Sequence, residues 1–410
     1  MKRCIGVWAC LLVGCGAGCP REAADHTAFL EQEAEADDQP DGHLDVPFAL
    51  LDHLLANELA RVPALPLPVP GLGTLSVVPL AARSRPAGPN RLGFTVEFVV
   101  KQGQKTLFSL GADTEVTPQI EGNHLGFTLG PEALRALRPR LGPEANAAMA
   151  ALLRAHMPAP LRLALSAARL RTLTDEALGT VANAVWALLR DGAAADLMPR
   201  IPLQVALPAL PIHRLTLRSR AGWLEVGLLA RLPAGDGAQP PPAAQAAPSA
   251  NQVRLRLSGA AVSALGNQAI TDGHLPARYS EKGKADPQGP MAVALGWAPE
   301  ARPLKVLVWQ TEGTCVQARL GGTPRLAVQT KGGTRELEVR LTDGVVEDIS
   351  GSLLVEAGAW LTGAWDRTLK FTQNVAAETR MEVAGRPLKL ALADGAVSPQ
   401  GLVLTLEVSR

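Results

Sequence analysis

Residues 44–59 read LDVPFALLDHLLANEL, and the rest of the chain can be organised around this stretch. A short run of strand-forming residues ends at Pro47, a residue that is favoured at the first position of a helix. The apolar residues that follow recur three or four positions apart, at Phe48, Leu51, Leu55 and Leu59. This spacing places them on one helical face, so the stretch predicts a strand that runs directly into a helix.

A second stretch, residues 255–270 (LRLSGAAVSALGNQAI), has the same order of features. Ser258 follows a short strand and suits the N-cap of a helix. The apolar stripe of that helix is Val262, Leu265 and Ala269. When the two stretches are aligned at Val46 and Leu257, their apolar patterns coincide. This weak internal repeat predicts two tandem units, each of which opens with a strand and a helix.

Most of the remaining sequence alternates between apolar and polar residues. Residues 91–100 (RLGFTVEFVV), 335–341 (RELEVRL) and 402–408 (LVLTLEV) show this period of two most clearly. The pattern is typical of an antiparallel sheet with one buried and one solvated face. Glycine-containing pairs between such runs predict hairpin turns at Gly321-Gly322, Gly332-Gly333, Asp343-Gly344 and Asp394-Gly395.

Two further helices are expected. Thr174 can cap a helix that ends near Gly192, with Leu178, Val181, Val185 and Leu188 as its apolar stripe and with Trp186 and Leu189 widening it. The other covers residues 144–156, between Pro143 and Pro158. The predicted fold class is therefore α+β and β-rich, with two tandem units of long, twisted antiparallel sheet, each wrapped on one or two helices.

The N-terminus has the features of a secretory signal. Lys2 and Arg3 precede an apolar run from Ile5 to Gly14, which is about half of the roughly 20 residues that a spanning helix needs. The sequence Leu12-Val13-Gly14-Cys15 resembles the bacterial lipoprotein box, which predicts a signal peptide over residues 1–14 and lipidation of Cys15. Residues 16–19 (GAGC) fit the box less well. An ordinary cleaved signal is the alternative interpretation.

Lipidation would hold the mature protein to a membrane through its acyl chains, since two chains already give stable anchoring. Gly16 rather than an aspartate follows Cys15, a pattern that favours the outer membrane, on its periplasmic face or at the cell surface. Residues 15–42 are expected to be a lipidated acidic tether, because residues 20–42 carry eight acidic residues and one arginine. The compartment and the lack of a basic run exclude nucleic acid as a partner.

The cysteines and histidines offer no cofactor site. Cys4 and Cys10 leave with the signal, so Cys19 and Cys315 remain in an oxidising compartment, and whether they pair is open. These two distant cysteines and seven scattered histidines predict no metal site and no cofactor.

The length of the body predicts two domains. Residues 234–251 (AGDGAQPPPAAQAAPSAN) are rich in proline and alanine and have no periodicity, which is typical of a linker. We expect an N-terminal domain of sheet and helix over residues 43–233 and a sheet-rich C-terminal domain over residues 252–410.

Two consecutive strand–helix–sheet units on a lipoprotein resemble the tubular lipid-binding superfamily, which includes bactericidal/permeability-increasing protein. The resemblance rests on residues 44–59 and 255–279 and on the helix at 174–189, under a fifth of the chain, and the family's usual disulfide has no counterpart here. It implies a sheet curled around a long helix, with an apolar tunnel for acyl chains. No binding residue of the family can be transferred to a position of this chain.

The expected function is that of an outer-membrane lipoprotein that binds or carries a lipid or another hydrophobic ligand non-covalently in an apolar groove. The candidate ligand-lining residues are Leu178, Val181, Val185, Trp186, Leu189, Val262 and Leu265. Residues 62–73 (VPALPLPVPGLG) predict an apolar loop that touches the membrane or admits lipid through Leu65, Leu67 and Val69.

The alternative functions are a structural or assembly lipoprotein that acts as a scaffold for other envelope proteins and, less favoured, a hydrolase of envelope polymers. The common nucleophile, phosphate-binding and zinc-protease motifs do not occur in the sequence, so no catalytic residue is predicted and the chain is not expected to be an enzyme.

Overall fold

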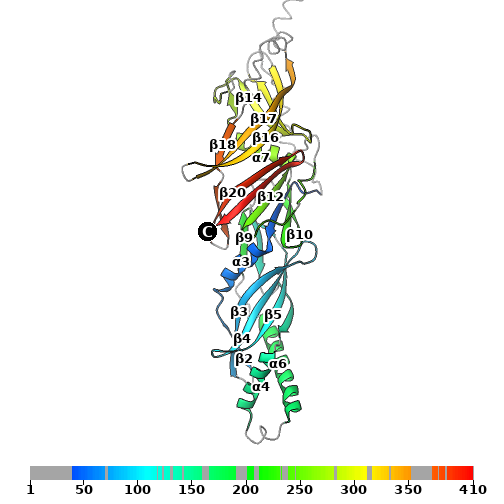
Figure 1. The fold of residues 1–410 in the computed structure, drawn as a ribbon, viewed down its shortest axis with the longest axis vertical. Coiled ribbons are helices and arrows are strands. Elements are labelled where there is room, and N and C mark those ends of the chain that lie inside the picture. Colours follow the sequence, from blue (N-terminus) through cyan, green and yellow to red (C-terminus); the bar gives the residue numbers. More distant parts are fainter. Residues whose placement is uncertain are drawn as a thin grey trace, which may run out of the picture.

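The protein was analysed as a computed structural model. It describes residues 39–69, 73–117, 119–121, 124–129, 133–140, 143–158, 166–190, 201–206, 212–230, 232, 239–244, 246–280, 284–311, 316–331, 334–351, 372–376, 378–383 and 386–409. The described part is elongated, with a sheet and two helices at one end, a second sheet at the other and a third sheet between them (Figure 1). All strand pairs within these sheets are antiparallel, and the helices are few, so the predicted β-rich α+β class is confirmed.

The middle of the molecule is a seven-stranded sheet in the order β10-β11-β1-β12-β21-β20-β19. Its strands are β10 (Ile212–Ser219), β11 (Trp223–Ala230), β1 (Gly42–Pro47), β12 (Gln252–Ser258), β21 (Gly401–Ser409), β20 (Arg386–Ser398) and β19 (Glu378–Val383). β1 pairs with β11 along one edge and with β12 along the other. Strands from before and after residues 234–251 therefore belong to one sheet, which we call the central sheet.

The first half of the chain adds a five-stranded sheet, β2-β3-β4-β5-β8. These strands are β2 (Leu65–Val69), β3 (Gly73–Arg85), β4 (Leu92–Gln102), β5 (Lys105–Val116) and β8 (Leu134–Arg140), and the helices of this half are α3 (Phe48–Leu59), α4 (Pro143–His156) and α6 (Ala167–Arg190). Leu51, Leu55 and Leu59 of α3 are buried against this sheet, as their spacing predicts. The same apolar core reaches Leu224 and Val226 of the central sheet.

A small three-stranded sheet joins the edges of the central sheet. It contains β6 (Gln119–Glu121), β7 (His124–Leu129) and β9 (Ile201–Ala206), in the order β6-β7-β9. β9 lies beside β19 and β6 lies beside β10, which are the two outermost strands of the central sheet. The three-stranded sheet therefore bridges one edge of the central sheet to the other.

The second half adds α7 (Gly259–Thr271) and a six-stranded sheet, β13 (Arg278–Tyr279), β14 (Met291–Trp297), β15 (Leu304–Gln310), β16 (Val316–Lys331), β17 (Thr334–Gly351) and β18 (Thr372–Ala376). Ser258 caps α7, as predicted, by accepting a hydrogen bond from the Ala261 amide at 3.1 Å. The Asn267 side chain fastens α7 to β14. It donates to the Leu295 carbonyl and accepts from the Leu295 amide, each at 2.8 Å.

One helix start and three turns differ from the sequence predictions. α6 begins at Ala167, so Thr174 is not a cap; its hydroxyl is buried and donates to the Leu170 carbonyl one turn earlier. The pairs 321–322, 343–344 and 394–395 are not hairpin turns, because they lie inside β16, β17 and β20. Register shifts accompany the first and third pairs, and Asp343 has a φ of 52°. Glycine and aspartate tolerate the backbone conformations that both bulges and turns require, so these pairs also fit a bulge inside a strand. The fourth pair, 332–333, lies outside the described residues.

The segment at residues 65–69 is a strand with buried side chains and not an exposed loop. Leu65, Leu67 and Val69 of β2 point into the core, and Pro66 and Pro68 point outward on the edge of the five-stranded sheet. An edge strand tolerates proline because one side of its backbone needs no partner. None of the helices in the described residues is long and apolar enough to cross a membrane.

Candidate functional site

The two faces of the central sheet differ sharply in polarity. Side chains alternate across a strand, so His43, Asp45, Glu225, Arg254 and Arg256 share one face, which we call the charged face. The opposite face, which we call the apolar face, carries Leu44, Val46, Val226, Leu255 and Leu257 on the same strands. β12 therefore contributes arginines to one face and leucines to the other.

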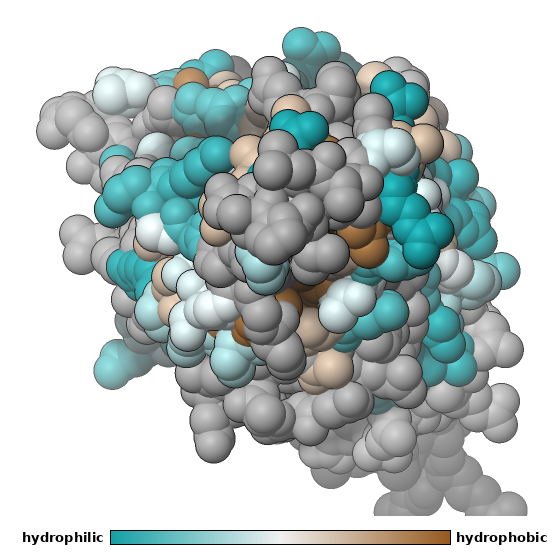
Figure 2. Space-filling model, turned by 90° about the horizontal axis from the view of Figure 1, so that it is seen from below, coloured by the Kyte–Doolittle hydropathy of each residue, from teal (hydrophilic) through white to brown (hydrophobic). Residues whose placement is uncertain are grey.

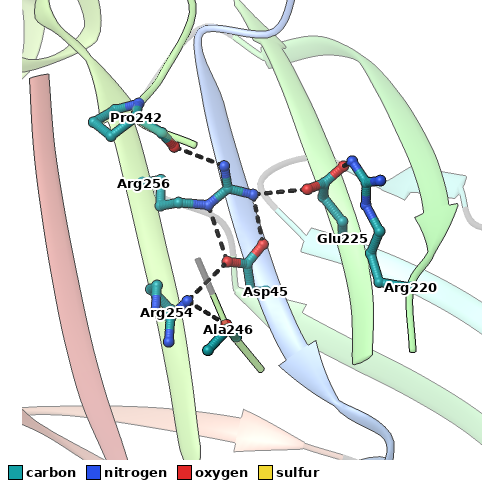
Figure 3. A network of polar contacts seen from close by, with 7 residues as sticks. All are labelled: Asp45, Arg220, Glu225, Pro242, Ala246, Arg254 and Arg256. Carbon is teal, nitrogen blue, oxygen red and sulfur yellow. Dashed lines mark hydrogen bonds and ion pairs between the residues drawn. The ribbon is translucent and has the colours of Figure 1, made fainter. Parts of the chain in front are cut away.

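A buried network of ion pairs occupies the charged face (Figure 3). Arg256 Nε and Nη2 donate to the two carboxylate oxygens of Asp45 at 2.9 and 2.8 Å, and Nη2 also donates to Glu225 Oε2 at 2.9 Å. Asp45 is 0 % exposed and Arg256 is 3 % exposed. Arg220 Nη2 donates to the second Glu225 oxygen at 3.1 Å. Strands from both halves of the chain thus share one set of charges.

Part of the segment that the sequence identifies as a linker covers this network. Residues 239–244 and 246–250, which we call the strap, lie over the arginines of β12 and include the buried Pro241, Pro242 and Pro248. The Pro242 carbonyl accepts a hydrogen bond from Arg256 Nη1 at 2.8 Å, and the Ala246 carbonyl accepts one from Arg254 Nη1 at 2.6 Å. The described part of this segment is therefore packed onto the sheet and is not a free tether.

The chain just before β1 is held in the same way. The Asp41 amide donates to the Leu228 carbonyl at 2.9 Å, and the Asp41 carboxylate accepts from the Ala230 amide at 2.9 Å. Residues 39–42, which the sequence places in the acidic tether, thus belong to the folded body.

The network shifts the ionisation of two side chains. Burial, together with the nearby Arg256, lowers the pKa of His43 below its ordinary value. Burial alone would raise the pKa of the Glu225 carboxyl, but His43, Arg220 and Arg256 together hold that pKa below its ordinary value. His43 Nδ1 is buried and has no hydrogen-bond partner among the described groups. The network therefore favours an ionised Glu225 and makes protonation of His43 less favourable than that of an exposed histidine.

The apolar face is not uniformly covered. Leu217, Val226 and Leu228 are buried against the core of the first half. In contrast, every apolar side chain that β21 presents to this face is only partly buried, namely Leu402, Leu404, Leu406 and Val408. Val408 packs against the core of the first half and Leu402 against a second cluster around Ala261, so Leu404 and Leu406 lie between them along the strand.

This partly exposed row lies within the sheet and not at its edge. β21 is flanked by β12 and β20. Leu255 on β12 and Leu44 and Val46 on β1 are also only partly buried, although each of them packs against the core of the first half. The strap occupies the charged face, and β7 of the three-stranded sheet, which we call the bridging sheet, lies beside β5 of the five-stranded sheet. The bridging sheet is therefore on the side of the apolar face. We call Leu44, Val46, Leu255, Leu402, Leu404, Leu406 and Val408 the apolar strip and take it as the candidate site.

The predicted ligand-lining residues of α6 lie elsewhere. Leu178, Val181 and Val185 are at most 1 % exposed and pack into the core of the first half. These three side chains, which are the described ones of that predicted stripe, expose almost no apolar surface. The side chains of Trp186 and Leu189 lie outside the described part, as do Cys15, Cys19 and Cys315. Val262 and Leu265 of α7 are partly buried and pack against the same buried cluster around Ala261 as Leu255 and Leu402 of the strip.

The surface of the described residues is mainly polar. Leu80 is the one large apolar side chain among them that is exposed, at 62 %. Figure 2 looks onto the end that carries α4 and α6, where apolar residues show near the centre and hydrophilic residues lie around them. The described side chains contain no cluster of three or more residues that could hold a metal ion.

Neither the ion-pair network on the charged face nor the apolar strip was predicted from the sequence. The alternation of Arg254 and Arg256 with leucines on β12 was a signal of a two-faced strand, and Asp45 was the matching signal on β1. The row on β21 was recognised as a strand but not as a ligand site. Its partial exposure depends on how distant parts of the chain pack, which a sequence pattern does not encode.

No family model and no curated protein sequence matches the chain. Among solved structures, P47 from Clostridium botulinum A2 is 8 % identical with a TM-score of 0.44, over 90 % of this chain and 97 % of that chain. P47 of Clostridium botulinum E1 is 8 % identical with a TM-score of 0.40, over 90 % and 98 % of the two chains. A lipopolysaccharide binding protein is 11 % identical with a TM-score of 0.23, over 90 % and 99 %. At these TM-scores the similarities are weak and architectural, and they assign no function to the chain.

Proposed function

We propose that this protein is a lipid-anchored envelope protein that binds one acyl-chain lipid, or a similarly apolar ligand, non-covalently on the apolar strip, and that it acts by binding and not by catalysis. The supporting observation is the row Leu402, Leu404, Leu406 and Val408, which is only partly buried although β21 lies inside the central sheet and the bridging sheet joins that sheet's edges. When an apolar ligand covers such side chains, it removes them from water, which stabilises the complex.

The size of the strip suits a hydrocarbon chain. Val408 is six positions after Leu402, and strands rise by about 3.4 Å per residue, so the row is about 20 Å long. The acyl chains of one bilayer leaflet span about 15 Å, half of the hydrocarbon core. Burying a dozen methylene groups contributes on the order of 10 kcal/mol before the ordering costs of binding. The row can therefore hold most of one acyl chain.

Binding is tested on the chain from residue 16 onward, which lacks the predicted signal peptide and the predicted acylated thiol and can therefore be purified without detergent. Native mass spectrometry with lipid extraction should find about one lipid per protein or, for a delipidated sample, uptake of a labelled fatty acid. A clean ligand-free mass with no uptake would overturn the proposal and leave a scaffold role.

A matched pair of variants locates the ligand. Leu404→Trp fills the middle of the apolar strip and should reduce fatty-acid uptake at least tenfold. Leu80→Trp makes the same change on an exposed leucine of β3 and should leave uptake unchanged. Equal uptake by the two variants would place the ligand away from the strip.

We further propose that Cys15 becomes the acylated N-terminus and that the mature protein resides in the outer membrane. The support is the lipoprotein box at residues 12–15 and the glycine that follows it. Mass spectrometry of the mature N-terminus should show a lipid-modified Cys15 that co-fractionates with outer membranes. An unmodified N-terminus after cleavage at another position would indicate an ordinary secretory signal.

A further inference from the structure

The strap and the ion-pair network beneath it connect the two halves of the chain. This connection contains one histidine, His43, whose protonation would change the charge of the network. β1 and β11 come from the first half and β12 from the second, and the strap is the covalent link between those halves. Arg256 contacts all of these parts, because it binds Asp45, Glu225 and the Pro242 carbonyl. Any change that draws Arg256 away from its partners therefore acts on the strap.

His43 is placed to cause such a change. In the sheet register it lies directly opposite Arg256 on one side and Gly227 on the other. Directly opposite residues of antiparallel strands have Cβ atoms about 4.5–5.5 Å apart. His43 is also two residues from Asp45 and so shares its face. Its buried Nδ1 has no hydrogen-bond partner among the described groups, so a proton acceptor is available inside the network.

Charged groups lie on every strand around His43. They are Asp41 and Asp45 on its own segment, Arg218 on β10, Arg220 just before β11, Glu225 on β11, Arg254 and Arg256 on β12, and, one strand farther away, Glu407 on β21. The described strap residues carry no charge. Asp45 and Glu225 are the carboxylates that Arg256 already binds, so a protonated His43 competes with Arg256 for the same oxygens and places a positive charge beside its guanidinium.

We propose that His43 and Arg256 form a pH-sensitive latch, in which protonation of His43 weakens the hold of Arg256 on Pro242 and loosens the strap from the central sheet. The direction of the His43 pKa agrees with this latch. Burial and Arg256 lower that pKa in the closed structure, so the closed form binds the proton less readily than an opened form does. Closure is then most stable above the ordinary histidine pKa of about 6.5 and weakens as the pH falls below it.

The latch does not depend on the proposed lipid ligand, and it is tested by hydrogen exchange on the ligand-free full chain. The amides to follow are those of strap residues 243, 244, 246, 247, 249 and 250 and that of Gln252, which donates to the Ser249 carbonyl at 2.9 Å. They are expressed as protection factors so that the intrinsic effect of pH on exchange is removed. Between pH 7.5 and pH 5.5, protection in the wild type should fall by up to about tenfold, the largest factor that one histidine gives one unit below its ordinary pKa.

Two variants separate the latch from a general effect of acid. His43→Gln cannot take up a proton in this range and should show no fall in protection. His274→Gln, a change at an exposed histidine after α7, should behave as the wild type. A fall in His43→Gln that equals the wild-type fall would overturn the latch, as would a wild type whose strap is equally protected at both pH values.

A measurement on the wild type covers the case in which His43→Gln does not fold. The ring of His43 is titrated by NMR with labelled histidine, alongside the amide signals of the strap. The latch requires one common midpoint, below pH 6.5, for the ring and the strap. A strap transition with a midpoint different from that of the ring would reject it.

Discussion

Arg256 and Asp45 form a bidentate ion pair, with distances of 2.9 and 2.8 Å, across the boundary between β1 and β12. Asp45 lies before the proline-rich segment and Arg256 after it, 211 residues apart in the sequence. Both side chains are buried, so neither can exchange its partner for water. The pair therefore ties the two halves of the chain together at one point of the central sheet.

The first prediction concerns this pair. Asp45→Ala leaves the buried Arg256 with an incomplete set of partners and should lower the free energy of unfolding by about 3–5 kcal/mol, because an unpaired buried charge is costly. The double variant Asp45→Leu, Arg256→Met removes both charges and should lose much less than the sum of the single changes. Urea denaturation measures each value. Additivity to within about 0.5 kcal/mol would show that the two residues are not coupled.

The second prediction concerns the attachment of α7 to β14. Asn267→Leu keeps the size of the side chain but leaves the Leu295 amide and carbonyl without the two hydrogen bonds that they now make. The expected loss of stability is about 2–4 kcal/mol, since an unsatisfied buried backbone group costs about 1–3 kcal/mol. Gln268→Leu on the exposed side of the same helix is the control and should change stability by less than about 0.5 kcal/mol. Equal losses in the two variants would contradict the attachment.

The third prediction contrasts two helical glycines. A Cβ atom at Gly259 would lie 2.1 Å from Trp297 Cδ1, and the Trp297 indole is fixed by its hydrogen bond to the Pro399 carbonyl at 3.0 Å. Gly259→Ala should therefore destabilise the protein by about 1–3 kcal/mol. Gly179 of α6 has no atom within 4 Å of such a Cβ, so Gly179→Ala should stabilise by about 0.5–1 kcal/mol. Thermal unfolding shifts of the same sign in both variants would be inconsistent with this packing.

The fourth prediction concerns the outer edge of β10, where Asn90 binds the strand. Asn90 pairs with Leu217 through two hydrogen bonds, one from the Asn90 amide to the Leu217 carbonyl at 3.2 Å and one from the Leu217 amide to the Asn90 side chain at 3.0 Å. Asn90 has a φ of 56°, so Asn90→Ala loses a hydrogen bond and strains the backbone as well. Asn90→Gly loses only the hydrogen bond. Alanine should cost about 1 kcal/mol more than glycine in denaturant unfolding, and the reverse order would show that backbone strain does not matter there.

The local elements of the fold could be predicted where one segment carries its own signals. Ser258 before an apolar stripe predicted the start of α7, and Pro143 and Pro158 bounded α4 correctly. The prediction at Thr174 failed because α6 begins seven residues earlier, and a threonine inside a helix can bond its hydroxyl to the preceding turn. Asp343-Gly344 and Asp394-Gly395 suit a bulge as well as a turn, so the lengths of β17 and β20 could not be predicted from these pairs.

The candidate site was less accessible to prediction. Three residues of the expected ligand stripe on α6, Leu178, Val181 and Val185, are buried in the core of the first half. Leu404 and Leu406 have the same alternation as the buried strands, yet they remain partly exposed. The difference lies in which elements pack on each face, and those elements are distant in the sequence.

The sequence by itself determined the β-rich class, most of the helices and the two-faced character of the strands, because these depend on short-range periodicity, capping and proline geometry. Only the tertiary structure decided that β1 and β12 pair, that the strap covers their arginines and that β21 leaves leucines partly uncovered. Each of these outcomes depends on contacts between segments up to about two hundred residues apart, and their free energies depend on burial that no single segment provides.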